Sequence, residues 1–152
     1  MAENAITVRN VAEDDFDRWA ELYRGYRDFY RLTPDEDVVR RVWSWLRDDR
    51  IGVQGLLAEH GSRVVGLTHY RRFHRPASGT VGLYLDDLFT DPDVRGNGAG
   101  RALLTALGSR AFAEGLSVVR WITAGDNATA RRLYDKVAQA TPWVTYDLSP
   151  EG

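Results

Sequence analysis

Three glycines and two arginines are concentrated in one short stretch whose chemistry suits an anion. The stretch reads Arg95-Gly96-Asn97-Gly98-Ala99-Gly100-Arg101, directly after an apolar strand-like run and directly before a run with helical spacing. Glycine lets the backbone approach a ligand closely, and the first N–H groups of a helix have no intrahelical partner. The helix dipole and the two guanidinium groups add positive charge. The sequence therefore predicts a binding site for a pyrophosphate or a similar anion at this turn.

Two common phosphate-binding motifs do not fit this stretch. A Walker A loop needs Gly-Lys followed by Ser or Thr, and the single lysine, Lys136, follows an aspartate. The dinucleotide fingerprint Gly-x-Gly-x-x-Gly needs a glycine in its sixth position. Counting from Gly96 that position is Arg101, and counting from Gly98 it is Leu103. A P-loop NTPase and a Rossmann oxidoreductase are therefore disfavoured.

Two adjacent carboxylates lie just before the glycine-rich stretch. Asp86 and Asp87 interrupt an otherwise apolar run, Thr80–Thr90, that has the composition of a strand. Strand alternation predicts that the two side chains point to opposite faces, so that only one of them faces a bound acceptor. The histidines have no metal-ligand spacing and the chain has no cysteine, so we expect no metal site.

An alternation of strands and helices is expected to position these groups. The predicted strands are Ile6–Val11, Gln54–His60, Arg63–Phe73, Thr80–Thr90, Ser117–Thr123 and Trp143–Leu148. The predicted helices run from Glu13-Asp14-Asp15 to Tyr30, from Thr33-Pro34 to about Arg50, over Arg101–Ala113 and from Asn127 to about Val137. Thr33 is expected to cap the second helix, Gly115 to end the third and Asn127 to cap the fourth.

Composition limits what the chain can be. With 152 residues it fits one domain, 1–152, with a core of ordinary size. A net charge of −2 gives no electrostatic reason to bind nucleic acid or an anionic membrane. No signal peptide or apolar span is recognisable, and cysteine is absent, so we expect a cytoplasmic protein without disulfides or thiolate catalysis.

The glycine-rich stretch resembles motif A of the GNAT superfamily of N-acetyltransferases. Arg95-Gly96-Asn97-Gly98-Ala99-Gly100 matches the pattern Arg-x-x-Gly-x-Gly between a strand and a helix, and Asn127-Ala-Thr-Ala-Arg-Arg-Leu-Tyr134 is similar to the next motif of that superfamily. Four further segments are similar to the yeast Hpa-type histone, polyamine and D-amino-acid acetyltransferases: Ile6–Arg9, Tyr26–Tyr30, Tyr84–Phe89 and Thr141–Tyr146. Leu85–Phe89 is also similar to a segment of diamine acetyltransferases. The resemblance covers essentially the whole chain.

This resemblance implies a fold and a co-substrate. The fold is α/β (α+β), a mixed central sheet of about six to seven strands with flanking helices, splayed between the fourth and fifth strands. The co-substrate is acetyl-CoA. The residues implied in binding it are Arg95, Gly96, Asn97, Gly98, Ala99, Gly100 and Arg101 at the pyrophosphate, the backbone of Leu88, Phe89 and Thr90 at the pantetheine, and Asn127.

Two catalytic roles follow from the same resemblance. Tyr134 is expected to protonate the leaving thiolate, since a phenol with an ordinary pKa of about 10 stays protonated at neutral pH. Asp86 is expected to deprotonate the amine through a water molecule. A bulge near Leu88 would exchange the roles of Asp86 and Asp87, and water alone is a further alternative. Without cysteine, direct attack of the amine on the thioester is favoured over an acetyl-cysteine intermediate.

The acceptor and the assembly are less specific expectations. Both resembled groups acetylate amines, so we expect a small primary amine such as a polyamine or an amino acid. The alternatives are a non-catalytic acetyl-CoA sensor and an acetyltransferase of protein or peptide amines. The strand at Trp143–Leu148 is a candidate for pairing between subunits, which predicts a homodimer.

Overall fold

The computed structural model of the chain describes residues 5–94 and 96–151. It divides into two units, Met1–Trp121 with the sheet and Ile122–Gly152 with helix α4 (Ala128–Val137). The one domain expected from the sequence stays a prediction.

The first unit contains a mixed sheet in the order β1-β2-β3-β4-β5. Its strands are β1 (Ile6–Asn10), β2 (Gln54–His60), β3 (Arg63–Arg75), β4 (Thr80–Thr90) and β5 (Val119–Arg120). The first four pair antiparallel in chain order, and β5 runs parallel to β4. β5 pairs only with Leu83 and Tyr84, so Leu85–Thr90 have no strand partner on that side in the described chain. The α/β class with a mixed sheet is confirmed.

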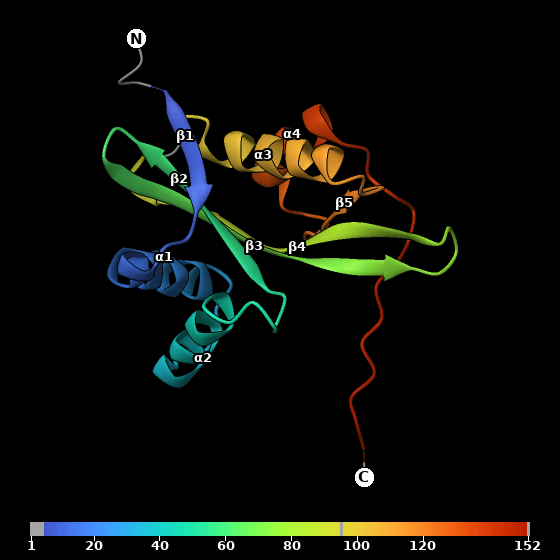
Figure 1. Cartoon of the computed structure of the whole chain (residues 1–152), viewed down its shortest axis with the longest axis horizontal. Coiled ribbons are helices and arrows are strands. Elements are labelled where there is room, and N and C mark those ends of the chain that lie inside the picture. The colour runs from blue at the N-terminus through green and yellow to red at the C-terminus, as the bar shows by residue number, and fades with distance from the viewer. Residues whose placement is uncertain (1–4, 95, 152) are drawn as a thin grey trace. The chain divides into compact units, whose positions relative to one another are not determined.

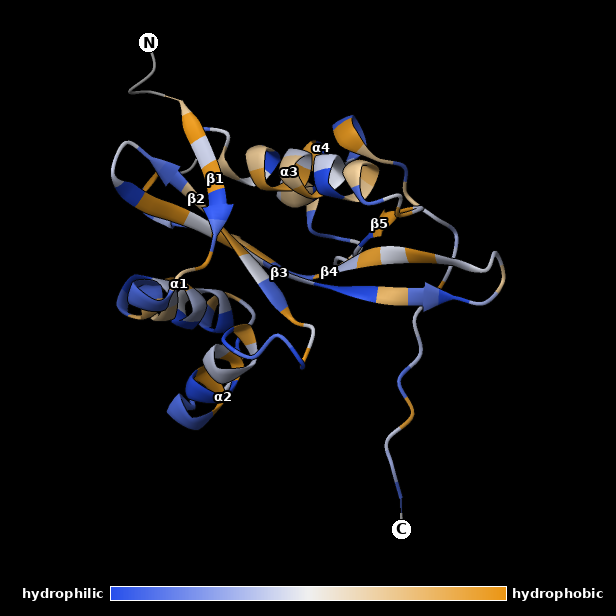
Figure 2. Cartoon of the chain, in the orientation of Figure 1, coloured by the Kyte–Doolittle hydropathy of each residue, from blue (hydrophilic) through white to orange (hydrophobic). Residues whose placement is uncertain are grey.

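Helices cover both faces of this sheet. They are α1 (Phe16–Phe29), entered through the short 3-10 helix η2 (Glu13–Asp15), α2 (Glu36–Leu46) and α3 (Ala99–Ala113). α1 and α2 lie on one face and α3 on the other (Figure 1). Trp19, Leu22 and Tyr23 of α1 are buried against Leu57 and Leu67 of the sheet. Figure 2 shows hydrophobic residues along the strands, whereas the end of β3 is mostly hydrophilic.

The predicted number of strands is wrong for the described chain, which has five. Trp143–Leu148 is not a strand: Trp143 is 81% exposed and Leu148 95% exposed. A strand requires a hydrogen-bonding neighbour, and the described residues offer this segment none. The predicted Ser117–Thr123 strand is shortened to β5: Val119 and Arg120 are in register with β4, and Ser117 and Val118 contribute one backbone hydrogen bond each.

The start of α2 also differs from the prediction. Asp35, and not Thr33, is the N-cap, because its carboxylate accepts the N–H groups of Asp37 and Val38 at 3.0 and 3.3 Å. A carboxylate at this position also interacts favourably with the helix dipole. Gly115, with φ +70°, lies directly after the C-cap of α3 as expected, and Asn127 caps α4 as expected.

Candidate active site

The glycine-rich turn connects the end of β4 to α3 through the 3-10 helix η3 (Pro92–Val94). Gly96 and Gly98 have φ of +84° and +86°, in the left-handed region that favours glycine, and Gly98 is the N-cap of α3. A Cβ at either position would meet no atom within 4 Å. Glycine is therefore required here by the backbone conformation, and the space beside it is open. Arg95, predicted to bind the same anion, lies outside the described residues.

Hydrogen-bond donors gather at the start of α3. The N–H of Ala102 bonds to Gly98 O at 2.9 Å and that of Ala99 to Asn97 Oδ1 at 3.2 Å. Between them, the N–H groups of Gly100 and Arg101 have no acceptor within the described chain. The Asn97 Nδ2 amide is buried and also has no partner among the residues described. Unpaired donors at a helix N-terminus fit a pyrophosphate.

Leu88, Phe89 and Thr90 lie on the segment of β4 that has β3 on one side and, among residues 5–94 and 96–151, no strand on the other. Phe89 is buried against α1, where a Cβ on Gly25 would lie 3.0 Å from its ring. Backbone groups along an open strand edge can pair with an extended ligand in the way an added strand would. This edge leads directly into the glycine-rich turn.

A β-bulge places Asp86 and Asp87 together. On β3, His69 is opposite Asp87 and Tyr70 is opposite Leu85, so Asp86 is the extra residue of the bulge. Asp86 pairs with Arg71 and Asp87 with His69, and these partners are two residues apart on β3, hence on one face. The expectation of opposite faces is wrong, and the bulge lies two residues before the expected position near Leu88.

The two carboxyl groups have different surroundings. Burial raises the pKa of Asp86 above its ordinary value, the ion pair with Arg71 (Nε–Oδ2 3.0 Å) opposes this, and the charge of Asp87 adds to the rise. Burial acts on Asp87 in the same direction, but hydrogen bonds from His69 (Nδ1–Oδ2 2.7 Å) and Tyr26 outweigh it, so the pKa of Asp87 is lowered. Neighbouring carboxyl groups with pKa values pushed apart are typical of an acid–base site.

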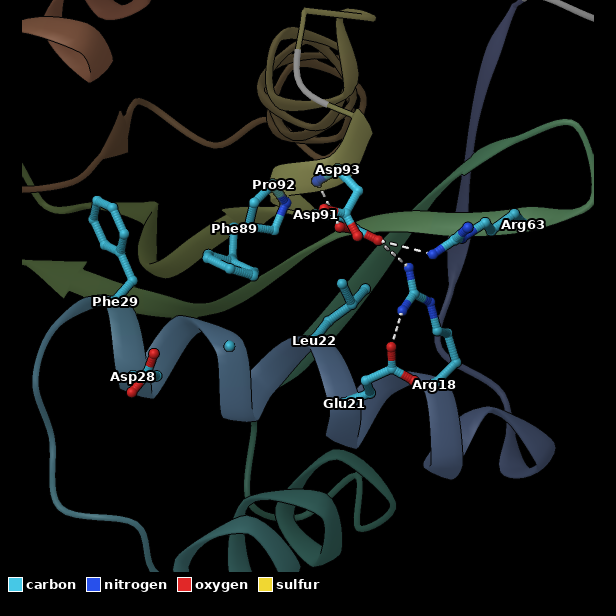
Figure 3. Close-up of a pocket in the computed structure, with 11 residues that line it drawn as sticks. Arg18, Glu21, Leu22, Asp28, Phe29, Arg63, Phe89, Asp91, Pro92 and Asp93 are labelled. Atoms are coloured by element: carbon cyan, nitrogen blue, oxygen red, sulfur yellow. Dashed lines mark hydrogen bonds and ion pairs between the residues drawn. The ribbon is translucent and has the colours of Figure 1, made fainter.

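A cavity of about 270 Å³ lies between α1 and the end of β4. Figure 3 shows Phe29, Phe89 and Pro92 along its apolar part and Arg18, Arg63 and Asp91 at its charged end. A second cavity, of about 430 Å³, lies beside Gly98 and Arg101.

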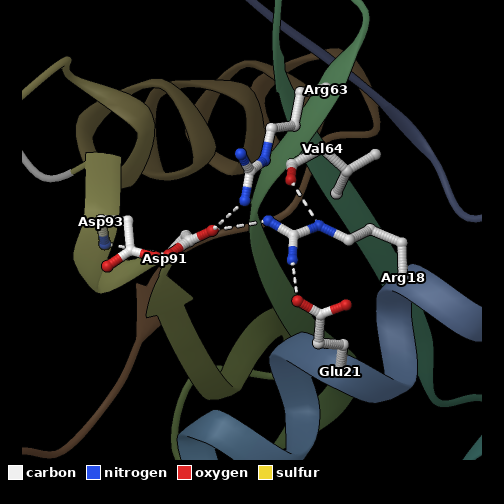
Figure 4. A network of polar contacts seen from close by, with 6 residues as sticks. All are labelled: Arg18, Glu21, Arg63, Val64, Asp91 and Asp93. Atoms are coloured by element: carbon white, nitrogen blue, oxygen red, sulfur yellow. Dashed lines mark hydrogen bonds and ion pairs between the residues drawn. The ribbon is translucent and has the colours of Figure 1, made fainter.

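Asp91 anchors the start of the glycine-rich turn (Figure 4). This buried carboxylate accepts from Arg18 at 2.6 Å and from Arg63 at 3.2 Å, and it also accepts the N–H of Asp93 at 2.9 Å. Arg18 donates in addition to the carbonyl of Val64 at 2.9 Å. The network thus joins α1, β3 and the turn.

Sequence reasoning missed the roles of several residues in these contacts. Arg18, His69 and Asp91 carried no recognisable motif, and Tyr26 lay in a segment of the resemblance without a role assigned to it. Contacts such as these join residues that lie far apart in the sequence. Arg18 and Asp91, for example, are separated by 73 positions. Only the fold brings them together.

Asn127 and Tyr134 belong to the second unit. The Asn127 side chain accepts the N–H of Ala130 at 3.3 Å, and Tyr134 is half-buried on α4. In the described part of the chain, no three His, Asp or Glu side chains converge as metal ligands would. Nor does any helix described there have the length and apolar character needed to cross a membrane.

Comparison with known proteins finds similarity to acetyltransferases. The acetyltransferase (GNAT) family matches residues 16–138. The D-amino-acid N-acetyltransferase HPA3 of Saccharomyces cerevisiae is 29% identical over 149 residues, which are 96% of this chain and 92% of that protein. The phosphinothricin N-acetyltransferase of Alcaligenes faecalis is 30% identical over 115 residues, 72% of this chain and 57% of that one.

Solved structures agree on the fold. The aminoglycoside N-acetyltransferase AAC(6')-Iy, crystallised in complex with CoA, superposes with a TM-score of 0.77 at 15% identity. The match covers 95% of each chain. At this identity the likeness concerns the fold.

Proposed function

Since the chain belongs to the GNAT family of N-acetyltransferases, we propose that it transfers the acetyl group of acetyl-CoA to a primary amine of a small molecule. The observation that carries this proposal is the continuity of three features in one unit. The Asp86–Asp87 pair, the open edge of β4 and the unpaired donors of the glycine-rich turn follow one another along 16 residues, 86–101.

Each of these features has a part in the proposed reaction. Acetyl-CoA supplies the activated thioester. The N–H groups of Gly100 and Arg101, with Asn97, hold the pyrophosphate, and Leu88–Thr90 pair with the pantetheine amides. Asp86 removes a proton from the bound ammonium through water, since its raised pKa makes it the stronger base of the pair.

The bond changes then balance without an enzyme-bound intermediate. The neutral amine nitrogen forms a bond to the acetyl carbon while the carbon–sulfur bond breaks. The nitrogen releases its further proton to solvent to become the amide, and Tyr134 gives its phenolic proton to the leaving thiolate and regains one from solvent. The chain has no cysteine that could carry the acetyl group, which favours this direct transfer.

The amine class is supported by the named relatives. D-amino acids and phosphinothricin are small amines, and both names describe relatives that match most of this chain. We propose an amino acid, a polyamine or a similar small amine as the acceptor.

The test is CoA release measured with a thiol reagent, to which this cysteine-free chain adds no background. Acetyl-CoA is mixed with D- and L-amino acids, polyamines, aminoglycosides and histone peptides in turn. Saturable release with a small amine is the expected result. Calorimetric binding of acetyl-CoA without release from any acceptor would instead identify a sensor, and release with peptides alone would identify a protein acetyltransferase.

We further propose a cytoplasmic homodimer without nucleic-acid or membrane partners. Support comes from the net charge of −2 and the exposed apolar side chains of the C-terminal segment, which include Trp143, Val144 and Leu148. Light scattering at micromolar concentration should give twice the chain mass. A monomer mass there would reject the dimer.

A further inference from the structure

A chain of buried hydrogen bonds runs from α1 through β3 to Asp87. The Trp19 indole Nε1–H donates to His69 Nε2 at 2.9 Å, and His69 Nδ1 lies 2.7 Å from Asp87 Oδ2. Trp19 is 0% exposed and His69 1% exposed, whereas the Asp87 side chain is 19% exposed. The chain of hydrogen bonds therefore starts at two fully buried side chains and ends at a carboxylate that solvent can reach.

The contacts of both ring nitrogens determine the tautomer of His69. An indole N–H can only donate, so His69 Nε2 must accept and carries no proton. The ring proton is then on Nδ1, where it is donated to Asp87. A proton on both ring nitrogens would place two N–H groups against each other at 2.9 Å.

The negative charge of Asp87 is not paired with an arginine in the described chain. The polar and charged side chains around it are Tyr23 and Tyr26 from α1, His69 and Arg71 from β3, and Asp86 from β4. Arg71 forms its ion pair with Asp86, and Arg27 of α1 bonds to Tyr23. Among the described residues, neither guanidinium forms an ion pair with Asp87, whose one ion-pair contact is with His69.

Aromatic rings lie beside this charge. Tyr26, whose hydroxyl donates to Asp87, has its ring centroid 4.9 Å from that of Tyr30 and 6.3 Å from that of Phe89. Tyr30 is 44% exposed. A carboxylate next to exposed aromatic faces is a suitable environment for an organic ammonium group.

We propose that Asp87 binds the ammonium group of the acceptor next to Asp86, and that Trp19 and His69 are positioning residues that hold the Asp87 carboxylate in place. This inference rests on the proposed acetyl transfer. Asp86 then takes one proton from the bound ammonium through water, and the neutral amine remains beside Asp87 for attack. The site selects cationic amines over neutral alcohols of the same shape.

The first test needs no turnover. ¹⁵N NMR of the free protein should show the His69 ring as the single Nδ1–H tautomer at neutral pH, with its signals assigned by their loss in His69→Asn. Trp19→Phe removes the donor to Nε2 and should shift the Nε2 signal, while Nδ1–H stays bonded to Asp87. A wild-type ring protonated on Nε2 overturns the positioning role whether or not the protein proves to be an acetyltransferase.

The second test compares two substitutions of His69. Asn places an amide N–H where Nδ1–H was, whereas Leu removes the donor, so His69→Leu should raise KM for the amine about tenfold or more and His69→Asn should restore most of the loss. Calorimetric affinity for acetyl-CoA should stay unchanged in both. Trp43→Phe, which alters a ring packed on Trp19 at 5.2 Å without touching this chain of hydrogen bonds, is the matched control and should keep the amine KM.

The outcomes separate the two proposals. If wild-type protein releases CoA but His69→Leu and His69→Asn have equal amine KM values, the ammonium site is wrong and the acetyl transfer stands. If wild-type protein acetylates no amine, the acetyl transfer fails and the ammonium site fails with it. The tautomer of His69 then still decides whether Asp87 is positioned as described.

Discussion

Individual side chains at the site differ through their contacts more than through their type. Asp86 and Asp87 are chemically identical neighbours, yet one forms an ion pair with a half-exposed arginine and the other accepts from a buried histidine and a tyrosine. The pKa is raised for Asp86 and lowered for Asp87. Two aspartates can therefore have different roles in the proposed reaction, Asp86 as the base and Asp87 as the residue that binds the ammonium group.

Replacing Asp86 by Asn should remove the base. A base must be deprotonated to act, so wild-type kcat/KM should fall as the pH drops through the pKa of Asp86, which lies above the ordinary 3.8. Asp86→Asn should lower kcat/KM about 10²- to 10⁴-fold at neutral pH and abolish that acid limb. Asp93→Asn, on an exposed carboxylate near the turn, serves as the control. An Asp86→Asn protein with the parental pH–rate profile would exclude this role.

Tyr134→Phe should separate catalysis from binding. Loss of the phenolic proton removes general-acid assistance to the thiolate, and kcat is expected to fall by about two orders of magnitude or more. The Kd for acetyl-CoA, measured by calorimetry, should change little because the ring is retained. An unchanged kcat would show that the thiolate leaves without Tyr134.

At the level of elements, β4 and α3 together form the site because the segment between them is held at its first residue. Asp91 follows β4 directly and is bound by arginines of α1 and β3. The glycine-rich turn therefore starts from a fixed point and ends at a left-handed glycine that opens α3.

Gly98→Ala tests the backbone requirement of this turn. Because φ is +86° and nothing crowds the Cβ position, the cost is conformational, about 1 kcal/mol in the free energy of unfolding. The Kd for acetyl-CoA should rise as the donors of Gly100 and Arg101 lose their alignment.

Gly108→Ala is the matched control in the same helix. It also has open space at Cβ but lies inside α3, so it should stabilise the protein by about 0.5–1 kcal/mol and leave acetyl-CoA affinity unchanged. Thermal unfolding and calorimetry measure both effects. If Gly98→Ala and Gly108→Ala changed the stability and the Kd for acetyl-CoA equally, the left-handed glycine would not be needed for acetyl-CoA binding.

At the level of the whole molecule, acidic side chains tie distant parts of the first unit together. Asp15 accepts from Arg9 on β1 at 2.7 and 2.8 Å, and Asp91 joins α1, β3 and the turn. Burial acts to raise the pKa of both carboxyl groups in the folded protein. Hydrogen bonds outweigh it and lower the pKa, from Arg9 for Asp15 and from Arg18 for Asp91.

Acid should therefore weaken the fold. A carboxyl group whose pKa is lower in the folded than in the unfolded state stabilises the protein above its unfolded value and loses that contribution as pH falls through its folded pKa. We expect Asp91→Asn to lower the free energy of unfolding by about 1–3 kcal/mol at pH 7, with the difference from wild type shrinking below the ordinary carboxyl value of 3.8. Denaturant unfolding across this pH range measures it, and Asp49→Asn, on an exposed residue, is the control. If the difference in the free energy of unfolding between Asp91→Asn and wild type did not change with pH, the ionised carboxylate would not be the group that stabilises the fold.

The sequence by itself determined the local features of this protein. Gln54–His60 and Thr80–Thr90 were recognisable as strands at the bounds observed, the glycine-rich stretch as a turn that opens a helix, and Asn127 as a cap. These features depend on neighbouring residues, through side-chain alternation, glycine conformation and capping groups, so a linear pattern contains them.

The tertiary structure alone decided how the site is charged and held. The bulge that brings Asp86 and Asp87 to one face depends on the register against β3, and the buried Trp19–His69–Asp87 contacts join residues up to 68 positions apart (from 19 to 87). The absence of a strand at Trp143–Leu148 also depends on a partner and not on its composition. Pairing across the sheet and burial between elements arise only when distant segments meet, and no local pattern records them.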